Sequence, residues 1–307
     1  MNAASETPVY RAGYVTLIGS PNAGKSSIIN ALLGEKVAAV SDKPQTTRNA
    51  VRCVLTTGEY QIVVVDTPGV HKPRYAFGEF MAGEIEKALG AVDAVCLVAD
   101  ITKNLDDSVC EISARIARLG VPLILAANKI DKLRDKEDFW KYLETFQARL
   151  KPSSVVPVSA LEGTNIGELG DELAKYLPEG GAIYDGDVLM DATERFLAAE
   201  IIRERVFEAA EHEVPHSTAV SVEEFKSPDE YPDMKRASIR ADIIVERQGQ
   251  KGILIGQGGK MLKKIKTESK REMERRFGWP VTLELWVKVR PKWRKSNEGM
   301  RTAGYTR

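Results

Sequence analysis

A glycine-rich segment near the N-terminus, GSPNAGKS at residues 19–26, has the residue types that bind phosphate groups. Its glycines let successive backbone N–H groups turn toward one anion, and a helix that starts there adds a partial positive charge. The segment fits the pattern G-x-x-x-x-G-K-[ST], in which Lys25 neutralises the β- and γ-phosphates and the Ser26 hydroxyl is a ligand of Mg²⁺. A chance glycine turn is the alternative. The expected phosphate contacts are Gly19, Ser20, Pro21, Asn22, Ala23, Gly24, Lys25 and Ser26.

A second polar cluster follows a short apolar run at residues 62–65. It consists of Asp66, Thr67, Pro68, Gly69 and Val70. The carboxyl ends of parallel strands line the ligand crevice of a doubly wound sheet, so Asp66 is placed to hold Mg²⁺ through water. The Gly69 N–H can reach a γ-phosphate and respond to its loss. A simple turn, which Asp, Pro and Gly favour in any protein, is the alternative.

The run NKID at residues 128–131 closes another apolar segment and suits the recognition of guanine. Guanine presents two adjacent donors, N1–H and the 2-amino group, and the Asp131 carboxylate can accept from both. Adenine has an acceptor at N1 and no 2-amino group, so such a site rejects it by about 10⁴-fold or more. Lys129 is expected over the base plane, and Asn128 is expected to brace the loop. Further predicted contacts are Ile130, Ser159 and Ala160. A plain helix N-cap at Asp131 is the alternative.

Hydrolysis of GTP needs residues that respond to the γ-phosphate. A polar loop contains Thr46 and Thr47, and a threonine in this loop can complete the Mg²⁺ shell. Both threonines stay candidates, and we favour Thr47.

Val70 stands where Ras-like GTPases carry a glutamine. Valine cannot orient water by hydrogen bonding, so we expect slow intrinsic hydrolysis. Asn22 resembles the loop asparagine of GTPases that recruit K⁺, which makes K⁺ a further candidate cofactor. The predicted metal ligands are Ser26, Thr47 and Asp66, and the predicted catalytic residues are Lys25, Thr47 and Gly69.

The elements that must position these residues form an α/β pattern over residues 1–180. Buried strands are predicted for the apolar runs at 15–18, 62–65, 94–98, 123–126 and 155–158. Helical patterns, such as 108–119 and 136–150, lie between most of them. The alternation predicts a doubly wound, mostly parallel sheet with helices on both faces, and 50–57 is expected as an edge strand. The glycines of PEGGAIYDG indicate a linker at 181–192.

A different pattern fills residues 193–295 and predicts a small α+β domain. Its expected order is helix, strand, strand, helix and strand, at 193–211, 217–225, 237–247, 260–277 and 281–289. The polar residues 296–307 are expected as a flexible tail.

Charge separates the two parts, although the net charge of the chain is zero. Residues 235–307 hold 20 lysines and arginines against 7 acidic residues, a net charge of +13, which leaves −13 for the rest. Such a basic domain favours polyanions. Within it, IGQGG fits the G-x-x-G loop that clamps a nucleic-acid backbone, and a basic helical pattern follows. A solvated basic helix after a glycine turn is the alternative. The predicted RNA contacts are Ile255, Gly256, Gln257, Gly258, Gly259, Lys260, Lys263 and Lys264.

The chain resembles the Era family of bacterial GTPases in motifs that follow in order: GSPNAGKSS, PQTTR, DTPGVH, NKID, VSA, QKGILIGQGGKMLKKI and LELWVKVRPKWR. The resemblance covers nearly the whole chain and implies a P-loop GTPase domain followed by a type II KH domain. It implies GTP or GDP with Mg²⁺ as ligands, the 3′ end of 16S rRNA as partner, and a role in maturing the small ribosomal subunit. It also implies some peripheral contact with the inner membrane. Ala23 stands where valine is more usual, with little expected effect on nucleotide binding.

Other classes are less consistent with the sequence. The first residues show no signal peptide, and no apolar run approaches the ~20 residues that span a membrane, so we expect a cytoplasmic protein. We also expect a monomer. Its three cysteines lack metal-ligand spacing and are expected to be buried free thiols.

A P-loop kinase or ATPase is disfavoured by Asp131, and a tRNA-modifying GTPase would need a further catalytic domain. The main alternative is a GTP-regulated RNA chaperone or membrane-peripheral signalling protein without a role in ribosome assembly.

Overall fold

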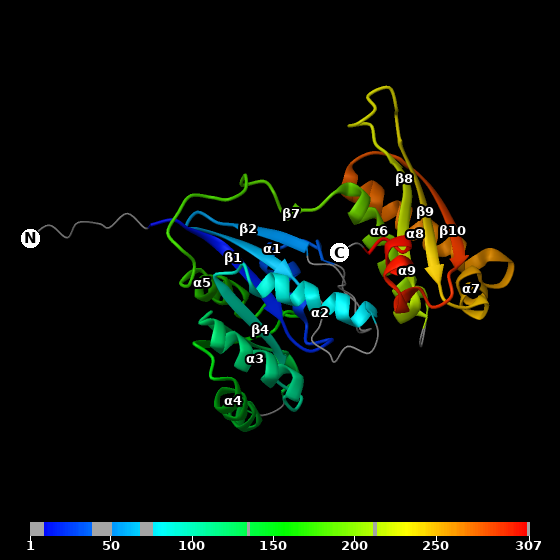
Figure 1. Ribbon diagram of the computed structural model, residues 1–307. Coiled ribbons are helices and arrows are strands. Elements are labelled where there is room, and N and C mark those ends of the chain that lie inside the picture. The colour runs from blue at the N-terminus through cyan, green and yellow to red at the C-terminus, as the bar shows by residue number, and fades with distance from the viewer. Residues whose placement is uncertain (1–8, 39–50, 68–75, 134–135, 211–213, 306–307) are drawn as a thin grey trace, which may run out of the picture. The chain divides into compact units, whose positions relative to one another are not determined.

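The computed structural model describes residues 9–38, 51–67, 76–133, 136–210 and 214–305 (Figure 1). Contacts between Cα atoms divide the chain into two compact units, of which the first includes most residues up to Asp191 and the second most residues from Ala192. Among the described residues, no helix combines the length and the apolar character that crossing a membrane requires.

The first unit contains a seven-stranded sheet in the order β6-β5-β4-β1-β3-β2-β7. The five strands from β6 to β3 in this order are parallel, and β2 and β7 each run antiparallel to their neighbour. The strands are β1 (Arg11–Ile18), β2 (Val51–Thr56), β3 (Tyr60–Asp66), β4 (Ala94–Asp100), β5 (Leu123–Asn128), β6 (Ser154–Val158) and β7 (Met190–Asp191).

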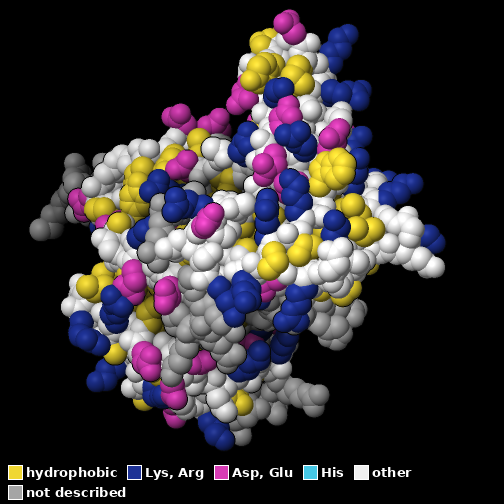
Figure 2. Space-filling model, turned by 45° about the vertical axis from the view of Figure 1, so that its right-hand side comes forward, with side chains coloured by type: hydrophobic (Ala, Val, Ile, Leu, Met, Phe, Trp, Pro, Cys, Tyr) yellow, Lys and Arg dark blue, Asp and Glu magenta, His cyan; other side chains and the backbone are white. Residues whose placement is uncertain are grey.

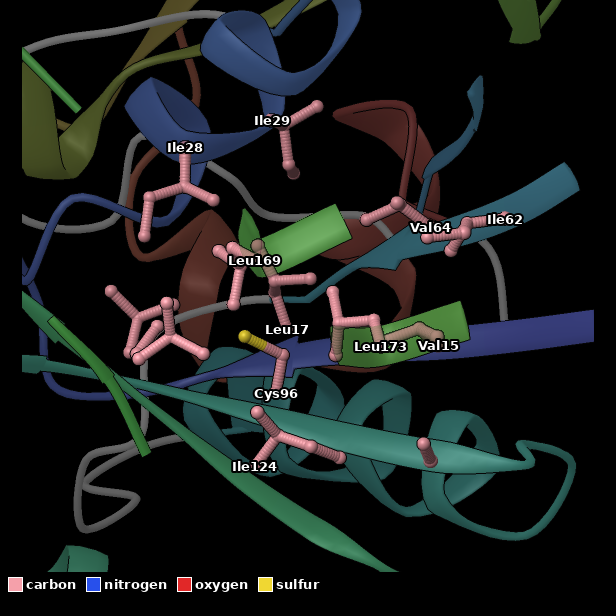
Figure 3. Close-up of a cluster of buried hydrophobic side chains, with 14 of the residues drawn as sticks. Val15, Leu17, Ile28, Ile29, Ile62, Val64, Cys96, Ile124, Leu169 and Leu173 are labelled. Atoms are coloured by element: carbon pink, nitrogen blue, oxygen red, sulfur yellow. The ribbon is translucent and has the colours of Figure 1, made fainter. Parts of the chain in front are cut away.

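Helices cover both faces of this sheet. On one face, α1 (Lys25–Leu33) and α5 (Ile166–Ala174) pack on the strands, and Figure 3 shows Ile28 and Leu169 in this cluster with Leu17 of β1. On the other face lie α3 (Asp107–Leu119), α4 (Lys136–Leu150) and the part of α2 (Ala76–Leu89) that belongs to this unit. Successive residues of a strand point to opposite faces, so the central strands are apolar at nearly every position.

The expected doubly wound, mostly parallel sheet is confirmed, with two differences at its edge. Residues 50–57 were expected as an edge strand, but β2 is covered by β7. The predicted linker at 181–192 contributes β7 and belongs to the first unit up to Asp191. The reason is Gln61, whose fully buried side chain binds this segment. Its Oε1 accepts from the N–H groups of Ile183 and Tyr184 at 2.7 and 2.9 Å, and its Nε2 donates to the Tyr184 carbonyl at 2.9 Å.

The second unit is a three-stranded sheet in the order β10-β9-β8, in which β10 is parallel and β8 antiparallel to β9. Its elements are α6 (Glu194–Ala209), β8 (Ala219–Lys226), β9 (Ala237–Val245), α7 (Gln248–Ile255), α8 (Lys260–Phe277), β10 (Val281–Val289) and α9 (Asn297–Thr302). The alternating residues of β10 bury one face: Val281, Leu283, Leu285 and Val287 join the core with residues of α6 and α8. The expected helix and strand order is confirmed, with α7 as an additional helix.

The C-terminal residues 296–307 were expected as a flexible tail, and the structure differs over the described residues 296–305. Ser296 caps α9 by accepting a hydrogen bond from the Gly299 N–H at 3.1 Å, and Met300, Ala303 and Tyr305 are buried. Trp293, just before this helix, is 1% exposed and donates from Nε1 to the Ser217 carbonyl at 2.9 Å. Apolar residues at short spacing therefore hold a segment that its polar composition made look unstructured.

The bonds of Gln61 generate a prediction about stability. Replacing Gln61 by Leu removes the three hydrogen bonds to the Ile183 N–H, the Tyr184 N–H and the Tyr184 carbonyl, so we expect it to destabilise the 181–191 segment by about 1–3 kcal/mol. Hydrogen exchange of the amides in 181–191 should become correspondingly faster. The control is Arg52→Ala, which removes a half-exposed ion pair with Asp191 at 3.3 Å and should change stability by less than about 1 kcal/mol. Equal exchange in both variants would contradict this role of Gln61.

Candidate functional sites

The glycine-rich loop lies between the end of β1 and the start of α1, as the sequence predicts. Gly24 has a φ of +104°, and a Cβ built there would lie 2.2 Å from Nδ2 of Asn128. A side chain at this position is excluded both by the backbone conformation and by the neighbouring amide. Lys25, which follows, is buried and donates from Nζ to the carbonyls of Gly19 at 3.1 Å and Ser20 at 3.4 Å. The loop therefore closes around the lysine ammonium.

Burial has a direct effect on Lys25. Removal of the ammonium from water lowers the pKa of Lys25 to about 8, and the negative charge of Asp66 partly opposes this shift. Asp66 is itself 3% exposed, at the carboxyl end of β3. Ser26 lies in the first turn of α1. A carboxylate and a hydroxyl beside this loop are the hard oxygen ligands that Mg²⁺ prefers, so the residues fit a magnesium ion.

Asn128 connects three parts of the site. From the end of β5, its Nδ2 donates to the Ala23 carbonyl at 2.8 Å, and its Oδ1 accepts from the Ala160 N–H at 3.1 Å. The side chain is 2% exposed. The glycine-rich loop and the segment after β6 are thus held to one strand end by the Asn128 side chain.

The residues beside Asn128 are also held in place. The Ser159 hydroxyl donates to Asp131 Oδ1 at 2.6 Å and accepts from the Glu162 N–H at 3.1 Å. Lys129 Nζ donates to the Asn22 carbonyl at 2.6 Å and to Asp100 Oδ2 at 2.8 Å. Asp131 is therefore oriented by a neighbouring hydroxyl, and Lys129 lies against the glycine-rich loop. The sequence did not single out Asp100, which ends β4 two residues beyond the strand predicted at 94–98.

Some predicted residues have other surroundings or lie outside the described residues. The Thr67 hydroxyl donates to the Leu17 carbonyl at 2.7 Å, and Ile130 packs on the core beneath the sheet. Both residues therefore stabilise the site through contacts within the protein. The predicted residues Thr46, Thr47, Pro68, Gly69 and Val70 lie outside the described residues.

The second glycine loop joins α7 to α8 in the second unit. Gly256 ends α7 with a φ of +70°, and a Cβ there would lie 2.7 Å from the Met261 Cβ. Gly258 has a φ of +59°, and no described atom lies within 4 Å of a Cβ built there. Gly259 is the N-cap of α8. The loop is therefore tight on its inner side and open on its outer side, where a backbone could approach.

Basic side chains surround this loop. Lys260, Lys263 and Lys264 on the first turns of α8 are exposed, and Figure 2 shows Lys and Arg side chains on the surface of this unit. Ile255 packs partly on the core of the unit. Trp286 on β10 is 59% exposed. An exposed loop followed by lysines on a helix has the charge that phosphate groups require.

Family models and known relatives match this arrangement. A model described as "50S ribosome-binding GTPase" matches residues 14–129, and one described as "KH domain" matches residues 213–294. GTPase Era of Trichlorobacter lovleyi is 41% identical over 296 residues, which cover 96% of this chain and 98% of the relative. The chain belongs to the Era family of GTPases. GTPase Era of Alkaliphilus oremlandii is 40% identical and covers 96% of this chain and 99% of the relative.

Solved structures of Era match nearly the whole chain. A variant of Aquifex aeolicus Era bound to GDP and AlF₄⁻ has a TM-score of 0.90 and 38% identity, with 97% of this chain and 100% of that chain covered. Era in complex with MgGDPNP and nucleotides 1506–1542 of 16S ribosomal RNA has a TM-score of 0.91 and the same identity and coverage. The predicted family, its two-part fold and its GTPase class are confirmed.

The buried ammonium of Lys25 generates a prediction about protons. Phosphate groups should raise the pKa of Lys25 from its value of about 8, so GDP binding at pH 8 should take up a fraction of a proton. The affinity for GDP should accordingly fall between pH 7 and pH 8.5, in addition to other effects of pH. Calorimetry in two buffers of different ionisation enthalpy measures the uptake directly. A Lys25→Arg variant, whose side chain stays protonated, is the control and should show no such uptake.

If the natural protein and Lys25→Arg exchanged equal numbers of protons on binding, Lys25 would not be the group that titrates.

The folding stability of the nucleotide-free protein should depend on pH in the opposite direction to its affinity for GDP. Because its folded pKa is lower than that of the unfolded chain, Lys25 contributes stability that increases as the pH rises from about 8 toward the unfolded value.

Proposed function

We propose that this Era-family GTPase is a GTP-switched factor that binds the 3′ end of 16S rRNA and acts in assembly and maturation of the small ribosomal subunit. The observation that carries the proposal is the combination of the nucleotide site braced by Asn128 with the exposed glycine loop of the KH domain. Era bound to both MgGDPNP and a 16S rRNA fragment supports it, because the match to that protein covers 97% of this chain. We assign nucleotide binding to residues 1–180 and RNA binding to residues 193–295.

The proposed nucleotide contacts follow the geometry of the first unit. The loop of residues 19–26 holds the phosphates, with Lys25 on the β- and γ-phosphates. Asp131 accepts from N1–H and the 2-amino group of guanine, and the bond from Ser159 supports its orientation. Lys129 covers the base plane. The segment after β6, which the Ala160 N–H holds to Asn128 Oδ1, would lie beside the guanine oxygen.

Mg²⁺ would be held by Ser26 and by Asp66, with Thr47 as the proposed third ligand when the γ-phosphate is present. The ion supplies charge neutralisation of the phosphates. Gly69 and Thr47 would respond to the loss of the γ-phosphate, and Val70 leaves hydrolysis slow. K⁺ is proposed as an accelerator through Asn22, whose carbonyl already accepts from Lys129.

The proposed RNA contacts are the loop at 256–259 and the lysines that follow it. Successive phosphates would approach the open side of Gly258, while Lys260, Lys263 and Lys264 supply positive charge. Unstacked bases would pack on apolar residues near the loop, of which Ile253 is 52% exposed.

The location and oligomeric state belong to the same proposal. We propose a cytoplasmic monomer that also contacts the inner membrane peripherally. The net charge of +13 over residues 235–307 supports attraction to an anionic lipid surface as well as to RNA. Competition between anionic vesicles and an rRNA oligonucleotide for the protein would test whether one surface serves both.

The switch predicts a coupling between the two ligands. A GTP analogue should tighten binding to a single-stranded oligonucleotide from the 3′ end of 16S rRNA relative to GDP, by about tenfold. The linkage is reciprocal, so the oligonucleotide must increase the affinity for the GTP analogue over GDP by the same factor. Fluorescence anisotropy of labelled RNA measures the effect. Identical RNA affinity with both nucleotides would remove the switch from the proposal.

The glycine loop predicts the effect of a charge. Gly258→Asp places a carboxylate where RNA phosphates approach and should weaken RNA binding about tenfold or more, with GDP affinity unchanged. Gly258→Asn is the matched control, because Asn has nearly the same size and tolerates a φ of +59° equally well. It should weaken RNA binding much less. Equal losses in the two variants would mean that crowding or backbone strain, and not phosphate contact, explains the effect.

A further inference from the structure

Asp100 is a carboxylate that the motifs of the nucleotide site do not include. It ends β4, and the sheet register places it beside Asn128, the last residue of β5. The Ile101 N–H donates to the Asn128 carbonyl at 3.0 Å, so the backbone fixes this end of the two strands. The Asp100 side chain is only 9% exposed. A carboxylate buried to this extent needs hydrogen-bonding or cationic partners.

Both oxygens of Asp100 have such partners. Oδ2 accepts from Lys129 Nζ at 2.8 Å, and Oδ1 accepts from the Thr102 hydroxyl at 2.6 Å and from the Thr102 N–H at 3.2 Å. Lys103 is a second cation, with Nζ 3.6 Å from Oδ2 and a side chain that is 66% exposed. Burial raises the pKa of Asp100, but the hydrogen bonds from Lys129 and Thr102 outweigh it and hold the pKa below its ordinary value. Asp100 is therefore ionised at neutral pH.

The other end of this contact explains why it matters. Lys129 has a φ of +71°, a left-handed conformation that long side chains rarely adopt. From there its Nζ reaches two acceptors, Asp100 and the Asn22 carbonyl of the glycine-rich loop. A lysine side chain is flexible, and holding it in one orientation before the ligand arrives reduces the entropy that binding costs.

We propose that Asp100 is a positioning residue for guanine, whose carboxylate holds the Lys129 side chain in the orientation in which it covers the base. The inference rests on the proposed base site at residues 128–131. Asp100 acts through Lys129, and Thr102 in turn fixes the carboxylate. The role is therefore in nucleotide affinity and release, and the hydrolytic step itself does not depend on it.

The first test is Asp100→Asn, which keeps the shape of the side chain and removes its charge. Release of GDP should become about tenfold faster, because the ion pair between Asp100 and Lys129 is replaced by a hydrogen bond from the ammonium to an uncharged amide. The KM for GTP should rise, and kcat at saturating GTP should stay within about twofold. Lys103→Met is the matched control, since it removes the exposed cation beside the same carboxylate, and GDP release should not change. Thr102→Val should shift release in the same direction as Asp100→Asn, by less.

A double-mutant cycle decides whether the effect passes through Lys129. In a Lys129→Met background, Asp100→Asn should add no further acceleration of GDP release. An equal acceleration with and without Lys129 would overturn the proposal, and so would unchanged release in Asp100→Asn and Thr102→Val. A fall in kcat that matches the fall in kcat/KM would also overturn it, because it would place Asp100 in the chemical step.

A separate arm tests the base site on which the inference rests. Asp131→Asn should transfer preference from GTP to xanthosine triphosphate, because the asparagine amide can donate to the 2-oxo group of xanthine. Retained preference for GTP would contradict the proposed base site and the inference with it. A transferred preference combined with unchanged GDP release in Asp100→Asn would overturn the positioning role of Asp100 alone.

Discussion

The amide of Asn128 makes the two hydrogen bonds on which the arrangement of the first unit depends. One bond holds the glycine-rich loop through the Ala23 carbonyl, and the other holds the segment after β6 through the Ala160 N–H. The amide occupies the space that a Cβ on Gly24 would need, so the glycine and the asparagine require each other. Because an amide donates from one atom and accepts at another, it can join a carbonyl to an N–H where a carboxylate could not.

The two glycine loops of the chain use related physics for different ligands. Each precedes the N-terminus of a helix, α1 or α8, where unpaired N–H groups favour anions. The first loop closes around the buried Lys25, which suits a compact nucleotide phosphate. The second is open at Gly258 and followed by exposed lysines, which suits a longer backbone. The two loops therefore differ in the burial of their lysines, rather than in their glycines.

Much of this could be predicted from sequence, because strands buried on both faces and phosphate loops have strong local patterns. The bounds expected for 136–150, 260–277 and 281–289 agree with α4, α8 and β10. The predictions that failed concern contacts between residues that are far apart in the sequence. Neither β7 nor the burial of Tyr305 has a local signal, since each depends on partners far along the chain, such as Gln61 for the segment before β7. Asp100 was missed because a lone acidic residue at a strand end shows its partner only after the chain folds.

The most direct test of the central role of Asn128 is the affinity of an Asn128→Asp variant for GDP. The carboxylate keeps the size and can still accept from the Ala160 N–H, but it meets the Ala23 carbonyl with an oxygen in place of a donor. We expect GDP affinity to fall by at least about tenfold, with discrimination between GTP and inosine triphosphate weakened at the same time, because loop and base pocket lose their common support. Unchanged affinity and discrimination would contradict the dependence of the site on this one amide.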